Sequence, residues 1–352
     1  MIEKLDEILN KEELSREEMI FLLDLEEKDH LKKLFRRADE VRRQYCGEVV
    51  YLRGIIEFSN YCRRNCNYCG LRHGNLQLER YRLTPDQIVE NAHKLAELGI
   101  GTIVLQSGED PHYTAEIIED IIRRIKAAAD VAITLAVGER PREEYELWFN
   151  AGAERYLLKH ETINPDLYRQ LHPDMEYEER LRCLWDLREI GFQVGTGNMI
   201  GLPGQTTADI ADDILFMKKI DADMGGIGPY IPNDNTPLKG AKGGTVMDTL
   251  KALAVARLVL KETHLPATTA LGSIDSWGRE KGLQCGANVL MPNFTPSFYR
   301  KMYEIYPDKL CVDDTPDHCF NCIQARIKAI GREVGLSKGH SLKKRFREQS
   351  AG

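Results

Sequence analysis

Three cysteines in the first third of the chain have the spacing of an iron-sulfur ligand set. They are Cys62, Cys66 and Cys69, in the pattern C-x3-C-x2-C. A [4Fe-4S] cluster normally takes four thiolates, and no fourth cysteine lies close by. The pattern therefore predicts a cluster with one open iron. Such an iron can chelate the amino and carboxylate groups of S-adenosylmethionine (SAM), and an electron from the cluster can then break the sulfonium-carbon bond.

Two other uses of these cysteines are a structural zinc site and a redox disulfide. Zinc needs a fourth ligand, and His73 is the only candidate nearby. Zinc sites also usually take their cysteines in C-x2-C pairs on both sides. The spacing favours the cluster.

A second set of cysteines lies near the C-terminus, with His318 beside it. Cys311, Cys319 and Cys322 form the pattern C-x7-C-x2-C. Three thiols within twelve residues predict a second iron-sulfur cluster, [2Fe-2S] or [4Fe-4S], with an exchangeable or non-cysteine fourth ligand. Zinc held with the help of His318 is the alternative.

Composition limits the class of protein. The chain has 352 residues, 42% of them hydrophobic, and a net charge of -7, which disfavours a nucleic-acid binder. It contains no long apolar run, and its charged N-terminus lacks the apolar core of a signal peptide. We therefore expect a cytoplasmic protein without a membrane partner, whose nine cysteines serve metal binding or catalysis rather than disulfides. The basic tail from Lys338 is expected to be a solvated end.

The hydrophobic pattern predicts an α/β protein, a complete (β/α)8 TIM-type barrel. Residues 1–46 are expected to form a helical extension that caps the barrel, with a capping box at Ser15 and Glu18. The barrel is expected over 47–300, and a C-terminal Fe-S-binding segment over 301–352. Eight β-rich runs alternate with helical stretches. The runs are 49–58, 102–106, 131–137, 155–160, 193–200, 224–231, 267–274 and 287–291.

The working face of such a barrel lies at the carboxyl ends of its strands, and Cys62 to Cys69 follow the first strand. Ser107, Gly108 and Glu109 follow the second strand. There, a glycine allows close approach of a ligand, and a carboxylate can accept hydrogen bonds from an ammonium group. The same residues also fit an ordinary turn.

The fourth strand places Arg155, Lys159 and Glu161 on one face. Buried charges need partners, so the barrel lumen is expected to be polar, with Glu161 near the mouth and Arg155 roughly 20 Å below it. That arrangement suits an anionic substrate. The alternative is that Arg155 faces solvent at the barrel bottom. Thr268 and Thr269, expected on the seventh strand, add hydroxyl donors.

Seven stretches together carry a family resemblance. They are Ile56 to Cys62 with Cys69 to Arg72, Arg80-Tyr81-Arg82, Leu105 to Pro111, Arg155 to Thr162, Gly201 to Thr206, Pro266 to Ala270, and Cys285 to Asn288. The chain resembles the radical SAM superfamily and, within it, the [FeFe]-hydrogenase maturases of the HydE family. The resemblance implies a full barrel with SAM at its mouth and a role in H-cluster assembly. It implies a cysteine-bound Fe(CO)2(CN) substrate made by HydG, radical attack on the cysteine sulfur, and delivery to HydF. A reductant such as ferredoxin or flavodoxin and a monomeric state are also expected.

The resemblance also assigns residues. Cys62, Cys66 and Cys69 match the cluster ligands. Other matching positions hold SAM, line the internal substrate cavity or form the second-cluster site. Those for SAM are Ser107, Gly108, Glu109, Glu161, Arg180, Met199 and Gly201. Those for the cavity are Thr134, Arg155, Lys159, Thr268 and Thr269, and those for the second cluster are Cys311, Cys319 and Cys322. The family has an arginine where this chain has Lys159. The lysine keeps the positive charge but lacks the bidentate fork of a guanidinium.

Three other functions fit parts of the pattern. One is an amino-acid mutase resembling methylornithine synthase, and another is a sulfur-inserting enzyme resembling biotin synthase. The latter needs cysteines inside strands, for which Cys183 and Cys285 are too few. The third is a non-enzymatic carrier or scaffold with two clusters, which would have no use for SAM. A HydE-like enzyme with another small-molecule substrate is a further alternative.

Overall fold

The computed structural model describes residues 2–347. Its centre is a sheet of six parallel strands in the order β2-β3-β4-β5-β6-β8. Helices cover the outer face, so the strands are almost wholly buried, as parallel sheets are. The strands are β2 Gly54–Ser59, β3 Thr102–Ser107, β4 Ala132–Ala136, β5 Arg155–Leu157, β6 Gln193–Thr196 and β8 Met224–Gly225.

Single parallel bridges carry the pairing from β8 back to β2. Met224 pairs with His264, Pro266 pairs with Val289 of β10 (Val289–Leu290), and Asn293 pairs with Ile55 of β2. The fold is therefore of the expected TIM type. The strand β1 (Val49–Leu52), which precedes β2 in the chain, pairs with both β10 and β11 (Glu333–Gly335). Two short strands, β7 (Met199–Ile200) after β6 and β9 (Gly228–Pro229) after β8, pair with each other beyond the sheet.

The helices begin and end where side chains satisfy the backbone. Thr84 caps α4 in a capping box with Gln87, and Asn164 caps α7. The left-handed Gly191 ends α8, as glycine does most readily. The outer helices are α4 Pro85–Glu97, α5 Ala115–Ala128, α6 Arg142–Ala151, α7 Pro165–Leu171, α8 Tyr177–Ile190, α9 Thr207–Lys219, α10 Val246–Leu260, α11 Thr269–Ile274, α12 Gly278–Gln284, α13 Ser297–Arg300, α14 Pro316–Ala329 and α15 Lys344–Arg347.

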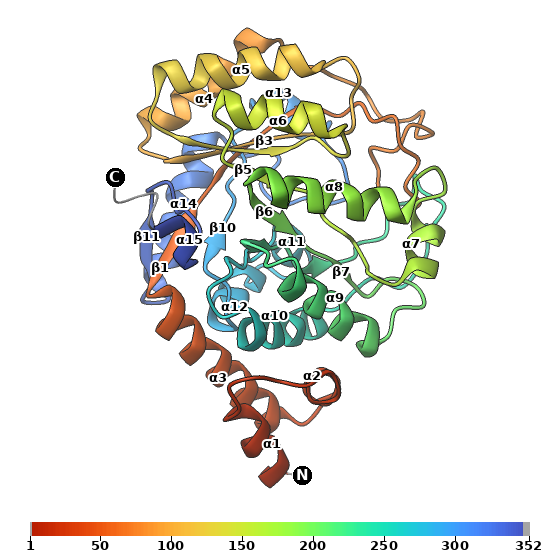
Figure 1. The fold of residues 1–352 in the computed structure, drawn as a ribbon, viewed down its shortest axis with the longest axis vertical. Helices are drawn as coiled ribbons and strands as arrows, with labels where there is room; N and C mark the ends of the chain where they lie inside the picture. Colours follow the sequence, from red (N-terminus) through yellow and green to blue (C-terminus); the bar gives the residue numbers. More distant parts are fainter. Residues whose placement is uncertain (1, 348–352) are drawn as a thin grey trace.

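The N-terminal extension is helical, as expected. It forms α1 (Ile2–Leu9), α2 (Arg16–Leu23) and α3 (Lys28–Cys46), and the predicted capping box at Ser15 is present. These helices do not cover the barrel opening. α2 and α3 pack beside the barrel against α9 and α10, and α1 packs on α3 (Figure 1). Arg16 of α2 makes two bonds of 2.6 and 2.8 Å to Asp212 of α9.

The prediction for the seventh strand, residues 267–274, is wrong because it lies too late in the chain. Residues 264–266 pair in the barrel, whereas 269–274 form α11. The Thr268 hydroxyl accepts a hydrogen bond from the backbone N–H of Leu271 and so begins the helix. Threonine favours strands by propensity, but its hydroxyl competes for backbone groups at a helix start, and here the cap decides.

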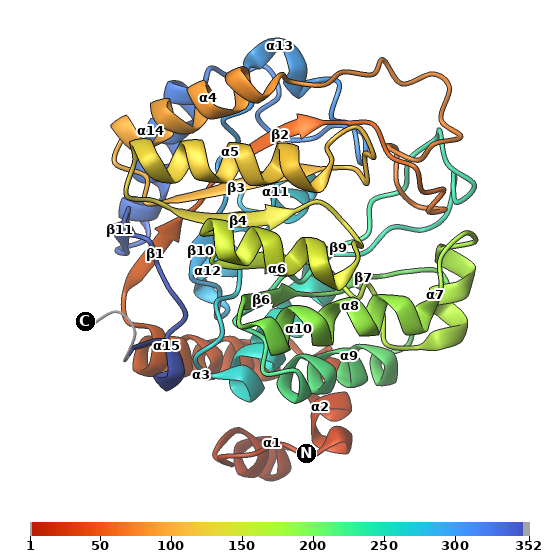
Figure 2. The same ribbon diagram turned by 45° about the horizontal axis from the view of Figure 1, so that its top comes forward.

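The basic tail is not a solvated end. The carbonyl oxygen of Lys338 accepts hydrogen bonds from Arg155 (2.5 Å) and Thr102 (2.7 Å), and Ser341 donates to Asp223 at 2.6 Å. Residues 338–341 therefore cross the amino-terminal ends of the strands and close the barrel floor. Figure 2 shows this end, with β11 and α15, opposite the loop that follows β2. Within residues 2–347, no helix has the length and apolar content needed to cross a membrane.

Candidate functional site

The cysteine loop lies at the mouth of the barrel. It continues past the arrowhead of β2, on the side of α7 (Figure 2). Asn67 binds the end of α7, with its backbone N–H 2.8 Å from the carbonyl oxygen of Leu171. The N–H of Gly70 donates to Ile305 at 2.8 Å, which joins the loop to the segment after α13. Cys62, the first cysteine, is thereby placed at the carboxyl ends of the strands, as predicted.

The three thiols of this loop are free and half-buried. Burial raises the pKa of Cys62 and of Cys66, and raises that of Cys69 to about 12. Neutral thiols must therefore give up protons to bind metal, as cluster assembly requires. In residues 2–347 no group of three His, Cys, Asp or Glu side chains converges to hold a single ion, and His73 is exposed. Three separate thiols on one loop fit a cluster better than zinc.

Gly108 is required by the approach of β3 to this loop. A Cβ atom at Gly108 would lie 2.2 Å from the carbonyl oxygen of Tyr61 and 2.8 Å from the Cβ of Cys62. The neighbouring Ser107 hydroxyl donates to the Gly108 carbonyl at 2.7 Å. Packing against the cysteine loop therefore explains Gly108, and the predicted close approach of a ligand there stays a prediction.

A chain of alternating charges links the cysteine loop to α8. Glu109 accepts bonds from Arg63 at 3.1 Å and from Arg64 at 2.5 Å. Arg64 also binds Glu139 at 2.9 Å, and the other oxygen of Glu139 accepts from Arg180 at 2.7 Å. Burial raises the pKa of Glu139, although Arg180 lowers it. The sequence analysis missed Arg63, Arg64 and Glu139; the turn after the third strand gave no recognisable motif.

This chain changes the expectation for Glu109. Its Oε2 binds both arginines, and its Oε1 accepts from the backbone N–H of Glu139 at 2.9 Å. The carboxylate is only 7% exposed and has its partners within the protein. An incoming ammonium group would have to share it with Arg63 or Arg64.

Glu161 has the features of a ligand-binding residue. Its backbone lies in the left-handed region at φ 64°, where a residue other than glycine is strained. Its Oε2 atom is buried and has no hydrogen-bond partner among the described residues. Beside it, Arg180 donates to the carbonyl oxygen of Lys159 as well as to Glu139. A free carboxylate oxygen near a fixed guanidinium fits the ammonium and carboxylate groups of an amino acid, and hence the methionine part of SAM.

The glycine-rich fifth-strand stretch is explained largely by packing. Gly201 has φ +86°, and a Cβ there would lie 2.3 Å from the Cα of Gly244. The Gln205 side chain accepts from the Gly201 N–H at 2.8 Å and donates to the Met199 carbonyl at 2.8 Å. Met199 is half-buried on β7, at the carboxyl side of β6. Its contact with adenosine remains a prediction.

Arg155 and Thr134 lie at the floor of the barrel. Arg155 is 3% exposed, so the alternative that it faces solvent is wrong. Its guanidinium binds Gln193 at 3.0 Å, besides Thr102 and Lys338 described above. The Thr134 hydroxyl is buried without a partner in the described chain. The cavity they share has a volume of about 10 Å³, which is room for a single water molecule.

The other expected substrate residues lie apart from this floor. Thr268 caps α11, and the Thr269 hydroxyl accepts from Arg279 at 3.2 Å. Lys159 follows β5 and gives its carbonyl oxygen to Arg180. Arg155 and Thr134 are thus joined at one end of the barrel, and Lys159 is joined to Arg180 at the other.

The second cysteine set is partly assembled. The Cys311 thiol donates to Cys319, and this bond lowers the pKa of Cys319. Cys322 is exposed on α14, one turn further on, and His318 pairs with Asp314 at 3.0 Å. Two thiols in contact and a third on the same helix are compatible with a cluster. His318 is paired elsewhere.

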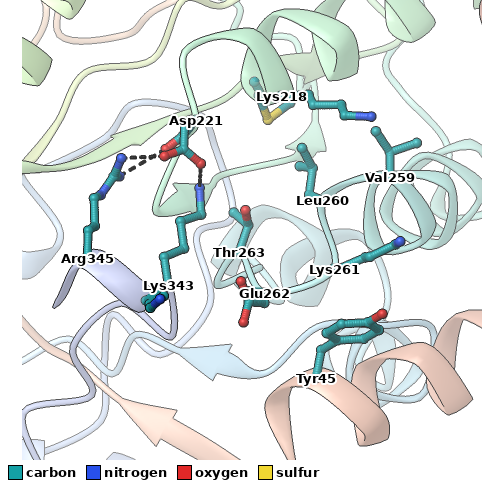
Figure 3. A pocket seen from close by; sticks show the side chains of 12 residues that line it. Tyr45, Lys218, Asp221, Val259, Leu260, Lys261, Glu262, Thr263, Lys343 and Arg345 are labelled. Carbon is teal, nitrogen blue, oxygen red and sulfur yellow. Dashed lines mark hydrogen bonds and ion pairs between the residues drawn. The ribbon is translucent and has the colours of Figure 1, made fainter. Parts of the chain in front are cut away.

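A surface pocket of about 410 Å³ lies away from all of these residues (Figure 3). Tyr45 of α3, Lys261 after α10 and the tail line it. Its Asp221 carboxylate binds Lys343 at 2.5 Å and also Arg345 (Figure 3). No cysteine lines this pocket, and the tail neutralises its central carboxylate. We therefore interpret it as a structural contact between α3, the end of α10 and the tail.

Comparison with known proteins agrees with this geometry. Residues 56–217, from β2 to α9, match the model of the Radical SAM superfamily, so the barrel and its cysteine loop are those of a radical SAM enzyme. The chain is 51% identical over 333 residues to the "[FeFe] hydrogenase maturase subunit HydE" of Thermotoga maritima, covering 95% of each. This chain therefore belongs to the HydE family of [FeFe]-hydrogenase maturases.

Two further relatives show where the family stands. A 3-methylornithine synthase of Methanosarcina acetivorans is 29% identical over 287 residues, 81% of each chain. The crystal structure of methylornithine synthase (PylB) superimposes with a TM-score of 0.81 at 25% identity, covering 94% of this chain and 97% of that one. The predicted family and barrel are confirmed, and the non-enzymatic alternative is wrong. Radical SAM enzymes use a [4Fe-4S] cluster and SAM, and the free thiols and the unpartnered Glu161 oxygen fit both.

Proposed function

We propose that this protein reductively cleaves SAM and acts on a cysteine-bound Fe(CO)2(CN) precursor in assembly of the di-iron subcluster of the [FeFe]-hydrogenase H-cluster. The observation that supports it is the meeting of three free thiols, the unpartnered Glu161 oxygen and Arg180 at one barrel mouth. When bound, the reduced cluster and SAM supply a 5'-deoxyadenosyl radical.

In this proposal the residues of the mouth bind and orient. Cys62, Cys66 and Cys69 ligate the cluster. Glu161 accepts from the ammonium group of SAM, and Arg180 donates to its carboxylate. Arg180 enters this role pre-oriented, since Glu139 holds its Nε at 2.7 Å.

The segment after α13 helps to exclude water. Lys309 reaches into the barrel and pairs with Glu57, whose exposed fraction is 3%. Tyr303, which is also buried, accepts a hydrogen bond from Gln106 at 3.3 Å. A primary carbon radical abstracts hydrogen from almost any C–H bond, so a mouth covered in this way protects the reaction.

We further propose the partners that this role requires. They are HydG as the source of the precursor, HydF as the acceptor of the product, and a ferredoxin or flavodoxin as the electron donor, all in the cytoplasm. The second cysteine set would hold a second Fe-S cluster.

The test measures 5'-deoxyadenosine produced by anaerobically reconstituted protein with SAM and dithionite. The reaction is run with and without a synthetic cysteine-Fe(CO)2(CN) complex, and Cys66→Ala is the inactive control. Stimulation by the complex that is lost in Cys66→Ala is the expected result. SAM cleavage that ignores the complex would move the substrate elsewhere, towards another small molecule, and the methylornithine synthase relatives would make amino acids the first to try.

A further inference from the structure

The loop that carries the cluster cysteines closes on one arginine side chain. The Nη1 of Arg80 donates to the carbonyl oxygens of Asn60 at 2.5 Å and Leu71 at 2.9 Å. Its Nη2 donates to those of Arg72 at 2.7 Å and Asn75 at 3.2 Å. One carbonyl lies before Cys62 and the others lie after Cys69, so a single guanidinium spans the loop from both sides.

Asn60 completes the base of the loop. Its Nδ2 donates to the carbonyl oxygens of Glu79 and Met302, both at 2.7 Å. Its Oδ1 accepts from the backbone N–H of Tyr81 at 2.8 Å. Backbone groups at a loop base need partners, and the side chains of Arg80 and Asn60 together bind seven of them. The cysteines are therefore carried on a closed ring of hydrogen bonds.

The charge of Arg80 has no carboxylate partner among residues 2–347. Burial lowers the pKa of its guanidinium, and the groups that oppose this shift are Cys62, Cys69 and Tyr61, all on the loop itself. The Arg80 guanidinium is half-buried, is held by neutral carbonyls and lies 6.0 Å from the centre of the Tyr61 ring, so negative charge nearby would stabilise it. Cluster thiolates would supply that charge.

We propose that Arg80 is a positioning residue for the iron-sulfur cluster. Its fork holds the ends of the cysteine loop together, and its positive charge offsets part of the negative charge of the ligated cluster. The inference rests on the proposed function only in placing a cluster on Cys62, Cys66 and Cys69.

Two variants separate the fork from the charge. Arg80→Lys keeps the positive charge, but one ammonium cannot reach four carbonyls arranged around a planar fork. Arg80→Gln loses both. Loss of an outer partner of a metal ligand typically weakens metal binding roughly 10- to 100-fold. We expect both variants to lose iron to an excess of chelator faster by a factor in that range. We expect only Arg80→Gln to have a lower midpoint potential, because removal of a positive charge disfavours the reduced cluster.

Arg257→Lys is the matched control. Arg257 also binds backbone carbonyls, at 2.8 Å from Gly286 and 2.9 Å from Thr263, and has no carboxylate ion pair in the described part of the chain, but these carbonyls lie outside the cysteine loop. It should retain iron like the wild type. If it loses iron as fast as Arg80→Lys, the effect is general loosening of the fold and the proposal fails.

The experiment uses reconstituted full-length protein, with iron retention, redox titration and the EPR change on SAM addition as readouts. If Arg80→Lys retains iron like the wild type, the positioning role of the fork is refuted. If the midpoint potential of Arg80→Gln is unchanged, the role of the charge is refuted. If Arg80→Gln does not fold, iron retention in Arg80→Lys still tests the role of the fork. The difference in midpoint potential between the wild type and Arg80→Met then tests the role of the charge. A wild-type protein without a SAM-responsive cluster would instead refute the proposed function.

Discussion

Replacement of Glu161 by glutamine should stabilise the empty protein and weaken SAM binding at the same time. The Oε2 atom of Glu161 is buried and unpartnered in the described structure. A buried group without its hydrogen bond costs about 1–3 kcal/mol, and a neutral amide costs less than a carboxylate there. Unfolding of apo Glu161→Gln in urea should therefore show a gain of about 1 kcal/mol.

The same change removes a charge-assisted bond to the ammonium group of SAM. Such bonds contribute about 1.5–3 kcal/mol, which corresponds to a roughly 10- to 150-fold rise in Kd. Calorimetric titration of SAM into the reconstituted variant measures it. Glu178→Gln is the control, because that carboxylate is only two residues from Arg180 on α8 but is 71% exposed and pairs with Arg169 instead. Wild-type SAM affinity in Glu161→Gln would refute the assignment, and lower apo stability would refute the reasoning about the unpartnered oxygen.

Three further changes test other parts of the mouth. Gly108→Ala should lower iron content on reconstitution, since the new Cβ would lie 2.2 Å from the Tyr61 carbonyl; full iron content would show that the loop can move aside. Lys309→Met should destabilise the apo protein by about 3–5 kcal/mol in urea, because the buried Glu57 carboxylate loses its cation and keeps only the hydrogen bond from Asn293. Adding Glu57→Gln should restore most of the loss, and no restoration would contradict the pairing. Burial, helped by Arg180, lowers the pKa of His172 from 6.5 to about 3, so the native state keeps it neutral and stability falls as the pH drops below 6.5. At pH 5 the loss is about 2 kcal/mol, and a thermal melt of His172→Gln should fall less between pH 7 and pH 5 than that of the wild type. An equal fall would assign the pH dependence to other groups.

Those features that depend on local order in the chain could be predicted. The cysteine loop, the helix starts at Ser15, Thr84 and Asn164 and the parallel order of the first six strands follow from spacing and periodicity. The loop and the helix starts are each decided by residues within a few positions of one another, and the parallel sheet follows from the alternation of strands and helices along the chain. The resemblance to HydE used the same kind of signal and is confirmed by the 51% identity.

Features that depend on partners far apart in sequence could not be predicted. Glu139 became visible only when β4 placed it between Arg64 and Arg180, which are separated from it by 75 and 41 positions. The basic residues of the tail suggest a solvated end, but Lys343 and Arg345 pair with Asp221, and the Lys338 carbonyl binds the barrel floor. Thr268 was assigned to a strand because propensity could not reveal that its hydroxyl begins a helix.

The floor of the barrel also bears on the order of assembly in the cell. The bond between Arg155 and the Lys338 carbonyl joins positions 183 residues apart, and β11 joins β1 across nearly the whole chain. Contacts of such long range form late, because their loop-closure entropy must be overcome first. During synthesis on the ribosome, the cysteine loop emerges well before residues 338–341, which close the floor. A cluster bound before those residues are made would therefore sit on a barrel whose floor is still open.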